Sequence, residues 1–337
     1  MRKLVIAEPG LFLGVKEERI VVRRSGEVVA EVPAAQISHV FVSTRGASLS
    51  SAALSLLLRH GAQLVLLDGR GRPLGRLLPL MRRGLRAVEA QIEALKDERG
   101  AALAKAFASS KALNQAALLR SAAHNRAESN PQLARMLLEA SVEIKSYAGL
   151  ILQFEGRLEE IRPEIVRMEA AAADIYWKLV AELLGGLVDF PGRRKRFDEP
   201  KDPANLLLNY GYGILSSICF LALELSSLDP YRGFLHVNSP RRPALVMDLM
   251  EEFRQTVVDR VVFRLLRELD LRAVVGADGL TREARKALAL KILERVKERT
   301  TFRGRSLPIE AHIYLQARRI RGFLLGHEPE YRGYVER

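Results

Sequence analysis

The stretch RIVVRRSGEVVAEV, residues 19–32, decides the architecture of the first part of the chain. Two short runs rich in β-branched residues flank the dipeptide Ser25-Gly26, which is the pattern of a β-hairpin. Outward from it, three more short apolar runs are candidate strands: KLVIA (3–7), HVFVS (39–43) and AQLVLLD (62–68). The segment between the last two has a serine N-cap at Ser50 or Ser51 and a terminal Gly61, which predicts one short helix.

The character of the sequence changes after Pro79. No proline occurs from 80 to 130, and residues 87–127 are rich in alanine, leucine, glutamate and lysine with helical periodicity. Proline or glycine residues then separate further predicted helices at about 132–155, 163–185, 203–227, 243–268, 281–297 and 308–325. The predicted fold class is α+β: a small β-rich domain with one helix at 1–80, a linker at 81–89 and an all-helical domain at 90–337.

The chain is strongly basic. Its 337 residues include 53 lysines and arginines against 40 acidic residues, a net charge of +13. Such an excess favours a polyanionic partner such as nucleic acid, although an arginine-rich proteome would also produce it. The sequence shows no segment with the pattern of a signal peptide and no apolar run that spans a bilayer, and it has a single cysteine, Cys219, expected to be a buried thiol. We therefore expect a cytoplasmic protein without a membrane partner.

Familiar catalytic patterns are missing from the sequence. It contains no P-loop, no dinucleotide fingerprint, no His-Glu-x-x-His, no paired cysteines and no Gly-x-Ser-x-Gly. If the chain is an enzyme, its carboxylates and His236 are the best remaining chemical groups.

The richest stretch for chemistry is GFLHVNSPRRPALVMDLMEEFR, residues 233–254. Asp248, Glu251 and Glu252 share one face of a predicted helix, where they either face solvent or are neutralised by arginines or a cation. His236 lies in the preceding loop, which is long enough to fold the imidazole back over this helix. A neutral imidazole with carboxylates is a ligand set suited to Mn²⁺ or Mg²⁺, while a histidine that is merely hydrogen-bonded is the alternative.

A further acid, Glu169, lies in RPEIVRMEAAAADIYWKLVAELL, beside an apolar helical stripe. A half-buried glutamate needs a partner, either a metal ion or an arginine of a neighbouring helix.

Together these stretches resemble the universal CRISPR-associated endonuclease and integrase family, the larger protein of the spacer-acquisition pair. The resemblance covers essentially the whole chain. It rests on GFLH…RRPALVMDLMEEFR, on DPANLLLNYGYGIL (202–215), on MEAAAADIYW (168–177) and on the C-terminal IYLQARRIRGFLLGHEPEYRGY. One departure is Ala170, where many members have glycine; alanine suits a helix and leaves the assignment of ligands unchanged.

The resemblance implies a metal site, with Glu169, His236 and Glu251 as metal ligands and catalytic residues and Asp248 as an auxiliary acid. Glu252 remains an alternative to Glu251. It also implies a divalent cofactor, Mn²⁺ or Mg²⁺, a homodimer formed through the β-rich domain, and the small partner protein of the acquisition pair.

The function implied is insertion of short DNA spacers into a repeat array by attack of a 3′-hydroxyl on a phosphodiester, with hydrolysis at the same site, on double-stranded and branched DNA. Candidate DNA-binding residues are Arg193, Arg194, Arg196, Arg241, Arg242 and Arg254. Asn205, Asn209 and Tyr212 match a family motif and are expected to support the site, or simply to brace it by hydrogen bonds. The alternatives are a non-catalytic basic nucleic-acid-binding scaffold and a general metal-dependent nuclease without integration.

Overall fold

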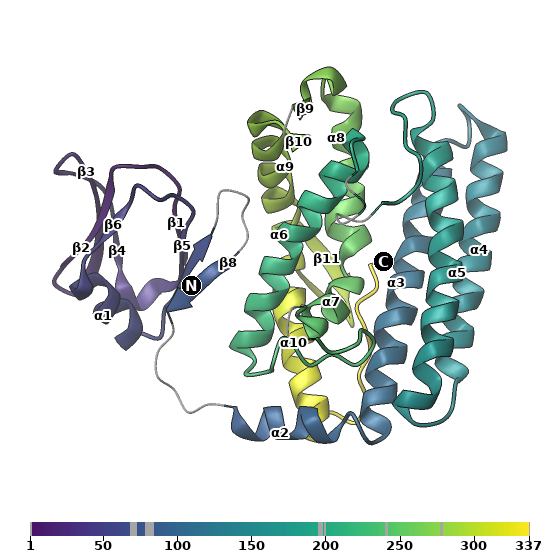
Figure 1. Cartoon of the computed structure of the whole chain (residues 1–337), viewed down its shortest axis with the longest axis horizontal. Helices are drawn as coiled ribbons and strands as arrows, with labels where there is room; N and C mark the ends of the chain where they lie inside the picture. The colour runs from purple at the N-terminus through teal and green to yellow at the C-terminus, as the bar shows by residue number, and fades with distance from the viewer. Residues whose placement is uncertain are drawn as a thin grey trace. The chain divides into compact units, whose positions relative to one another are not determined.

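The computed structural model describes residues 2–67, 73–77, 84–194, 198, 200–239, 242–276 and 279–336. Contacts divide the chain into two units, Met1–Arg83 and Gly84–Arg337 (Figure 1). The division falls inside the predicted linker 81–89. However, helix α2 spans Leu85–Glu93 and buries Ala87 and Ala90, so residues 85–89 belong to the second unit rather than to a linker.

Unit 1 contains two four-stranded sheets. The first has the order β1-β5-β7-β8, in which β1, β5 and β7 are parallel and β8 is antiparallel to β7. Its strands are β1 (Arg2–Ile6), β5 (Ile37–Val42), β7 (Gln63–Leu67) and β8 (Pro73–Leu77). The second has the order β4-β3-β2-β6, with the strands β2 (Leu11–Lys16), β3 (Arg19–Arg24), β4 (Glu27–Pro33) and β6 (Ser48–Leu49). The predicted hairpin is the antiparallel pair β3–β4.

One α-helix, α1 (Ser51–Arg59), accompanies these sheets, as predicted. Ser50 is its N-cap, since its hydroxyl accepts a hydrogen bond of 3.1 Å from the amide of Ala53, and Gly61 follows the helix with a positive φ of 75°. A short 3₁₀ turn, η1 (Ala34–Gln36), precedes β5. The core of unit 1 contains Leu13, Ile20, Leu56 and Leu57. The sequence patterns missed β2, β6 and β8, because β2 and β8 contain glycine and β6 has only two residues.

Unit 2 is mostly helical. Three long helices, α3 (Glu98–His124), α4 (Pro131–Gln153) and α5 (Leu158–Leu184), pack side by side (Figure 1). The second half of the unit contains α6 (Pro203–Leu225), α7 (Ala244–Glu251), α8 (Arg260–Glu268), α9 (Arg282–Arg295) and α10 (Ile309–Leu324). Side-chain N-caps begin several of these helices, at Asp97, Asn130, Asp202 and Thr281.

The expectation of an all-helical second domain is wrong in two places. Two small antiparallel sheets lie in unit 2, β9 (Val275–Gly276) with β10 (Gly279–Leu280) and β11 (Arg299–Phe302) with β12 (Arg305–Pro308). The second hairpin follows from local chemistry: β11 has consecutive β-branched threonines, and Arg303 and Gly304 form a two-residue turn with φ values of 50° and 73°.

Helix boundaries also differ from the sequence patterns. The predicted helix 87–127 is two helices, because Asp97 caps a new one, and Pro163 lies inside α5 rather than in its first turn. The predicted helix 243–268 is α7, then a π-helical segment η3 (Arg254–Asp259), then α8. Another 3₁₀ turn, η4 (Leu271–Ala273), follows α8. The change of winding after α7 matters for the site, because it sets where Arg254 and Asp259 lie.

Helix α6 is long and apolar enough by composition to cross a membrane. It nevertheless packs against α7, α9 and α10 and carries the buried polar Asn205, as the core helix of a globular unit does. Cys219 on this helix is fully buried, as expected, and burial raises the pKa of its thiol well above the usual range.

Candidate metal centre

The loop before α7 is held onto that helix by Asp248. The buried carboxylate accepts hydrogen bonds from the amides of Phe234, Leu235 and His236 at 2.6, 3.1 and 2.9 Å. It also lies 2.8 Å from Nδ1 of His236. Gly233 permits this close approach, since a Cβ there would lie 2.7 Å from Asp248 Oδ2. The loop therefore folds the histidine back over α7, as expected.

This contact determines which nitrogen of His236 is available. The Asp248 carboxylate accepts hydrogen bonds here, so Nδ1 is the donor in this contact, and a neutral imidazole with its proton on Nδ1 has the lone pair on Nε2. Nε2 lies 3.7 Å from Oε1 of Glu251. Asp248 is thus a positioning residue for the imidazole.

Glu251, at the end of α7, is 2% exposed and faces three positive or titratable groups. Oε1 is 3.0 Å from Nη2 of Arg254, and Oε2 is 3.1 Å from Nζ of Lys111. Burial opposes ionisation, but the charges of Arg254 and Lys111, together with His236 when it is protonated, outweigh it and lower the pKa of Glu251 from 4.5 to about 2.

Glu169, in the middle of α5, faces the same space. Its Oε1 forms an ion pair with Lys111, whose ammonium therefore contacts both Glu169 and Glu251. Burial lowers the pKa of Lys111, but the two carboxylates overcome this and raise it above its usual value. A single positive charge thus joins the two acids that the sequence predicted as ligands.

The residues present fit a divalent cation. Imidazole nitrogen and two carboxylates are suitable donors, and the buried Oε2 of Glu251 faces the ammonium of Lys111 at 3.1 Å but makes no hydrogen bond of regular geometry to the described part of the chain. Within the described ranges, no three histidine, cysteine or acidic side chains stand in ligand geometry. The reason is visible in the contacts: Lys111 lies between Glu169 and Glu251, and Arg254 binds Oε1.

Glu252 points to a different part of the unit. Its carboxylate accepts hydrogen bonds from Gln316 Nε2 at 2.7 Å, from the amide of Tyr334 at 2.6 Å and from the hydroxyl of Tyr331. Burial raises its pKa to about 7 despite these donors. Of the two adjacent glutamates, only Glu251 contacts His236 and Lys111 among the described residues.

A network of arginines and polar side chains surrounds Tyr212. The guanidinium groups of Arg254 and Arg193 lie 5.1 and 5.3 Å from its ring centre. Arg193 also donates to the side-chain oxygens of Asn205 and Asn209, at 2.9 and 2.7 Å. Through Arg193 and Arg254, these contacts link Asn205, Asn209 and Tyr212 to Glu251. That the three residues brace the site stays a prediction.

The network also includes a buried acid, Asp259. Asp259, at the end of η3, accepts hydrogen bonds from the hydroxyls of Tyr212 and Tyr176 at 2.5 and 2.7 Å. Burial raises the pKa of Asp259 to about 6 and those of both tyrosines well above their usual value. The network connects α5, α6 and η3 behind Arg254.

The candidate DNA-binding arginines have different surroundings. Arg193 is engaged in the network above, and the amide of Arg194 donates to Asn205 Oδ1 at 2.8 Å while its side chain is exposed. Arg242 is exposed beside a β-bridge to Ser239. Arg196 and Arg241 lie outside the described residues.

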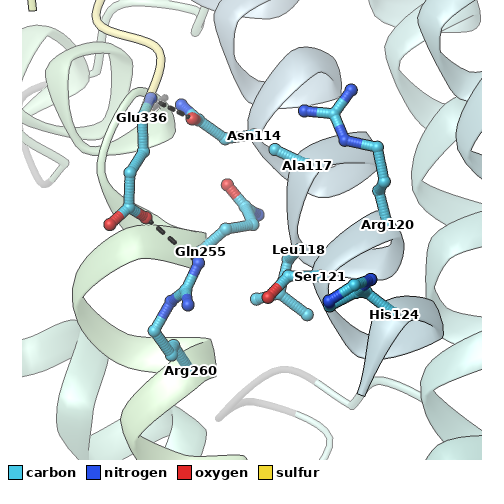
Figure 2. A pocket seen from close by; sticks show the side chains of 9 residues that line it. All are labelled: Asn114, Ala117, Leu118, Arg120, Ser121, His124, Gln255, Arg260 and Glu336. Carbon is cyan, nitrogen blue, oxygen red and sulfur yellow. Dashed lines mark hydrogen bonds and ion pairs between the residues drawn. The ribbon is translucent and has the colours of Figure 1, made fainter. Parts of the chain in front are cut away.

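A cavity of about 520 Å³ lies beside Asn114, between α3 and the start of α8 (Figure 2). Its described lining includes Asn114, Gln255, Arg260 and Glu336, and none of the three candidate ligands. The candidate metal centre is instead filled by its own side chains, chiefly Lys111.

Lys111 is the main residue that the sequence patterns missed. It lies on a helix whose alanines suggested nothing but packing, yet it is buried together with Ser109, Ser110, Asn114 and Gln115. That cluster of polar residues on an otherwise apolar helix was the available signal, because buried polar groups require partners.

Comparison with known proteins identifies the family of the chain. The family model described as CRISPR associated protein Cas1 matches residues 4–293. The chain belongs to this family. All three candidate ligands lie inside the matched range of the Cas1 model, whereas β11, β12, α10 and the C-terminal residues lie beyond it.

Two Cas1 relatives illustrate the similarity. The CRISPR-associated endonuclease Cas1 1 of Archaeoglobus fulgidus is 37% identical and covers 99% of both chains. The CRISPR-associated endonuclease Cas1 2 of Pyrobaculum aerophilum is 35% identical over 94% of this chain and 97% of its own.

Solved structures support the fold. A casposase bound to its integration product matches with a TM-score of 0.76 at 22% identity, over 98% of this chain and 93% of its own. The Cas1 protein of Thermotoga maritima matches with a TM-score of 0.69 at 19% identity, with complete coverage of both chains. The mixed architecture, a β-rich N-terminal part followed by a mostly helical part, is therefore that of Cas1 structures.

Proposed function

We propose that this Cas1 family protein is a metal-dependent DNA endonuclease and integrase of CRISPR adaptation. It would insert short DNA spacers into a repeat array by attack of a 3′-hydroxyl on a phosphodiester. The observation that carries the proposal is that Lys111 pairs with both Glu169 and Glu251, while Nε2 of His236 lies 3.7 Å from the same Glu251. The names of its relatives, endonucleases and an integrating casposase, support the reaction class.

Glu169, His236 and Glu251 would hold the cation, Mn²⁺ or Mg²⁺. When bound, it would polarise the scissile phosphate and lower the pKa of a bound water or hydroxyl. The protein's own contribution is positional: Asp248 orients the imidazole, and Arg254 holds Glu251 in its ionised form. Lys111 has to leave the space between Glu169 and Glu251 when a divalent ion enters, because the two cations repel.

Once displaced, Lys111 would remain beside the site as a charge able to neutralise a phosphate oxygen. Arg254 occupies a similar position, and the exposed Arg194 and Arg242 would contact the DNA backbone further out. We assign Arg193 a smaller direct role, because Asn205 and Asn209 already bind its guanidinium.

The experiment that tests this function is a Mn²⁺ titration of DNA cleavage and of strand transfer from a 3′-hydroxyl donor. Glu169→Gln should abolish both activities and leave DNA affinity within about twofold, because affinity depends on many phosphate contacts. Glu164→Gln, at a partly exposed acid on the same helix that pairs with Arg167, is the matched control and should behave like the wild type.

The rival functions predict different results. For a non-catalytic scaffold, Glu169→Gln would change stability with no metal-dependent reaction to lose. For a general nuclease, cleavage would need the metal but strand transfer would be absent. Wild-type cleavage rates in the Glu169→Gln variant would place the active site elsewhere.

The assembly that we propose is a homodimer formed through unit 1, together with a small partner protein of the acquisition pair. Support for a docking surface on unit 1 comes from β4, an edge strand on which Val28 and Val29 are 54% and 53% exposed. A chain in each of two solved Cas6-RT-Cas1–Cas2 complexes contains the fold of this chain. Sedimentation at micromolar concentration should show a dimer that Val28→Asp weakens; a wild-type monomer would contradict this arrangement.

A further inference from the structure

The C-terminal segment, Tyr331–Glu336, follows α10 and lies against the end of α7. The Tyr331 hydroxyl and the Tyr334 amide both donate to the carboxylate of Glu252. The ring of Tyr334 stacks on Phe253, with ring centres 4.6 Å apart. The segment thus holds the two residues that follow Glu251 directly in the sequence.

The same segment is tied to α3. Asn114 donates from Nδ2 to the carbonyls of Glu252 and Tyr334, both at 2.9 Å. In return its Oδ1 accepts from the amide of Glu336 at 2.9 Å (Figure 2). Asn114 lies one helical turn after Lys111, so the segment connects the two elements that carry Lys111 and Glu251.

The far end of the segment is anchored by charge. The Glu336 carboxylate forms an ion pair with Arg295 and lies 3.3 Å from Arg260. Arg295 also donates from Nε to the carbonyl of Thr256 in η3, at 2.9 Å. Glu336 is therefore bound to α8, α9 and, through Arg295, the π-helical segment that follows Glu251.

From these contacts we infer that the C-terminal segment is a positioning element for the metal ligand Glu251. Adjacent residues at a helix end project in directions about 100° apart, so holding Glu252 and Phe253 sets the direction of Glu251. The inference rests on the proposed function, because it concerns the cation that Glu251 would bind. None of the contacts involves a candidate ligand, and the whole segment lies beyond the matched family range.

Tyr331 is the residue through which the segment acts most directly. In the described part of the chain, its hydroxyl is the only hydrogen-bond donor to Oε1 of Glu252, since Gln316 and the Tyr334 amide bind Oε2. Without that hydroxyl, Oε1 would be buried and unsatisfied, and the end of α7 would shift to relieve it. Small displacements of a ligand matter, since loss of an outer contact typically costs metal affinity.

The test compares two tyrosine hydroxyls of the same segment. Tyr331→Phe removes the donor to Glu252. Tyr334→Phe removes the 2.9 Å bond to Thr300 Oγ1 and keeps both the ring and the amide that binds Glu252. Each full-length variant is titrated with Mn²⁺ alone by calorimetry, without DNA, and its melting temperature and strand-transfer rate are measured.

Tyr331→Phe should weaken Mn²⁺ binding about tenfold and lower the strand-transfer rate at limiting Mn²⁺, while saturating Mn²⁺ restores most of the rate. Tyr334→Phe should lower the melting temperature by a similar amount without changing Mn²⁺ affinity. Equal Mn²⁺ affinities for the two variants would overturn the inference and reduce the segment to a stabilising one. Failure of the wild type to bind Mn²⁺ would instead contradict the proposed function.

Discussion

Glu251 and Glu252 are neighbours at the end of α7 and have opposite environments. Both are buried, at 2% and 0% exposed. Glu251 faces Lys111, Arg254 and His236, and its pKa falls to about 2. Glu252 faces neutral donors of the C-terminal segment and Gln316, and its pKa rises to about 7.

The difference shows what separates a candidate ligand from an anchor. Burial penalises the ionised form of both groups, and only nearby positive charge compensates for it. Glu251 remains an anion that a metal could use, whereas Glu252 holds two parts of the fold together through hydrogen bonds. Both residues are glutamates, so the difference between a candidate ligand and an anchor comes from their surroundings.

The largest expected effect tests the difference between Glu251 and Glu252 directly. Glu251→Gln should lower strand transfer by at least about 1,000-fold, a loss of roughly 4 kcal/mol of transition-state stabilisation. Glu252→Gln should lower it by about tenfold or less, since every proposed ligand is retained. Single-turnover assays at saturating Mn²⁺ measure both; equal losses would show that the two glutamates do not have separate roles.

A second prediction concerns the cation that neutralises Glu251 in this structure. Lys111→Met leaves two carboxylates near each other without their shared charge, so the free energy of unfolding should fall by about 4 kcal/mol in the absence of metal. Mn²⁺ should restore much of it, because binding to the folded state stabilises that state. Denaturant titrations with Mn²⁺ and with a chelator provide the measurement. Lys105→Met on the same helix, which removes bonds to the carbonyls of Phe154 and Leu152, is the control.

A third prediction concerns Asp259, another buried acid near the site. The folded-state pKa of Asp259 is about 6, above its ordinary 3.8, so the folded chain binds this proton more tightly than the unfolded chain. Stability from this group is therefore complete below pH 3.8 and is lost as the pH rises to 6, by roughly 3 kcal/mol.

Asp259→Asn should remove this loss and flatten the stability curve between pH 4 and 6. Asp174→Asn, an exposed acid on α5, should leave the slope unchanged. Unfolding free energies at several pH values measure both, and parallel curves for the wild type and Asp259→Asn would contradict the assignment.

The smallest expected effect lies at the surface. Arg194→Glu should weaken DNA binding about threefold and make its dependence on salt shallower by about one unit of slope, since one phosphate contact is lost. Arg135→Glu, an exposed arginine on α4, carries the same change of charge. If both variants lose affinity equally at two salt concentrations, the effect reflects net charge rather than a contact.

The sequence predicted the two-part organisation well, because the spacing of apolar residues and the turn residues determine secondary structure locally. The β3–β4 hairpin, the Ser50 cap of α1 and most helices of unit 2 follow from such patterns. The sequence patterns failed for short strands that depend on their pairing partners, such as β6 and β9. They also failed where the helical winding changes, as it does at η3.

The candidate site was found by resemblance more than by local pattern. The spacing of Asp248 and Glu251 and the loop that carries His236 allowed a metal site as one interpretation, and the resemblance to the family selected it. The spacing also left Glu252 as an alternative, because residues 251 and 252 both lie near one face of an ideal helix, although the family motif favours Glu251.

By itself, therefore, the sequence determined the residue types, the local elements and the family of this chain, since these depend on neighbours within a few positions. Only the tertiary structure decided that Asp248 orients His236, that Lys111 lies between Glu169 and Glu251, and that Glu252 binds the C-terminal segment. These contacts join residues 12 to 140 positions apart. Their energies depend on burial and on the charges of several elements at once, which no local pattern contains.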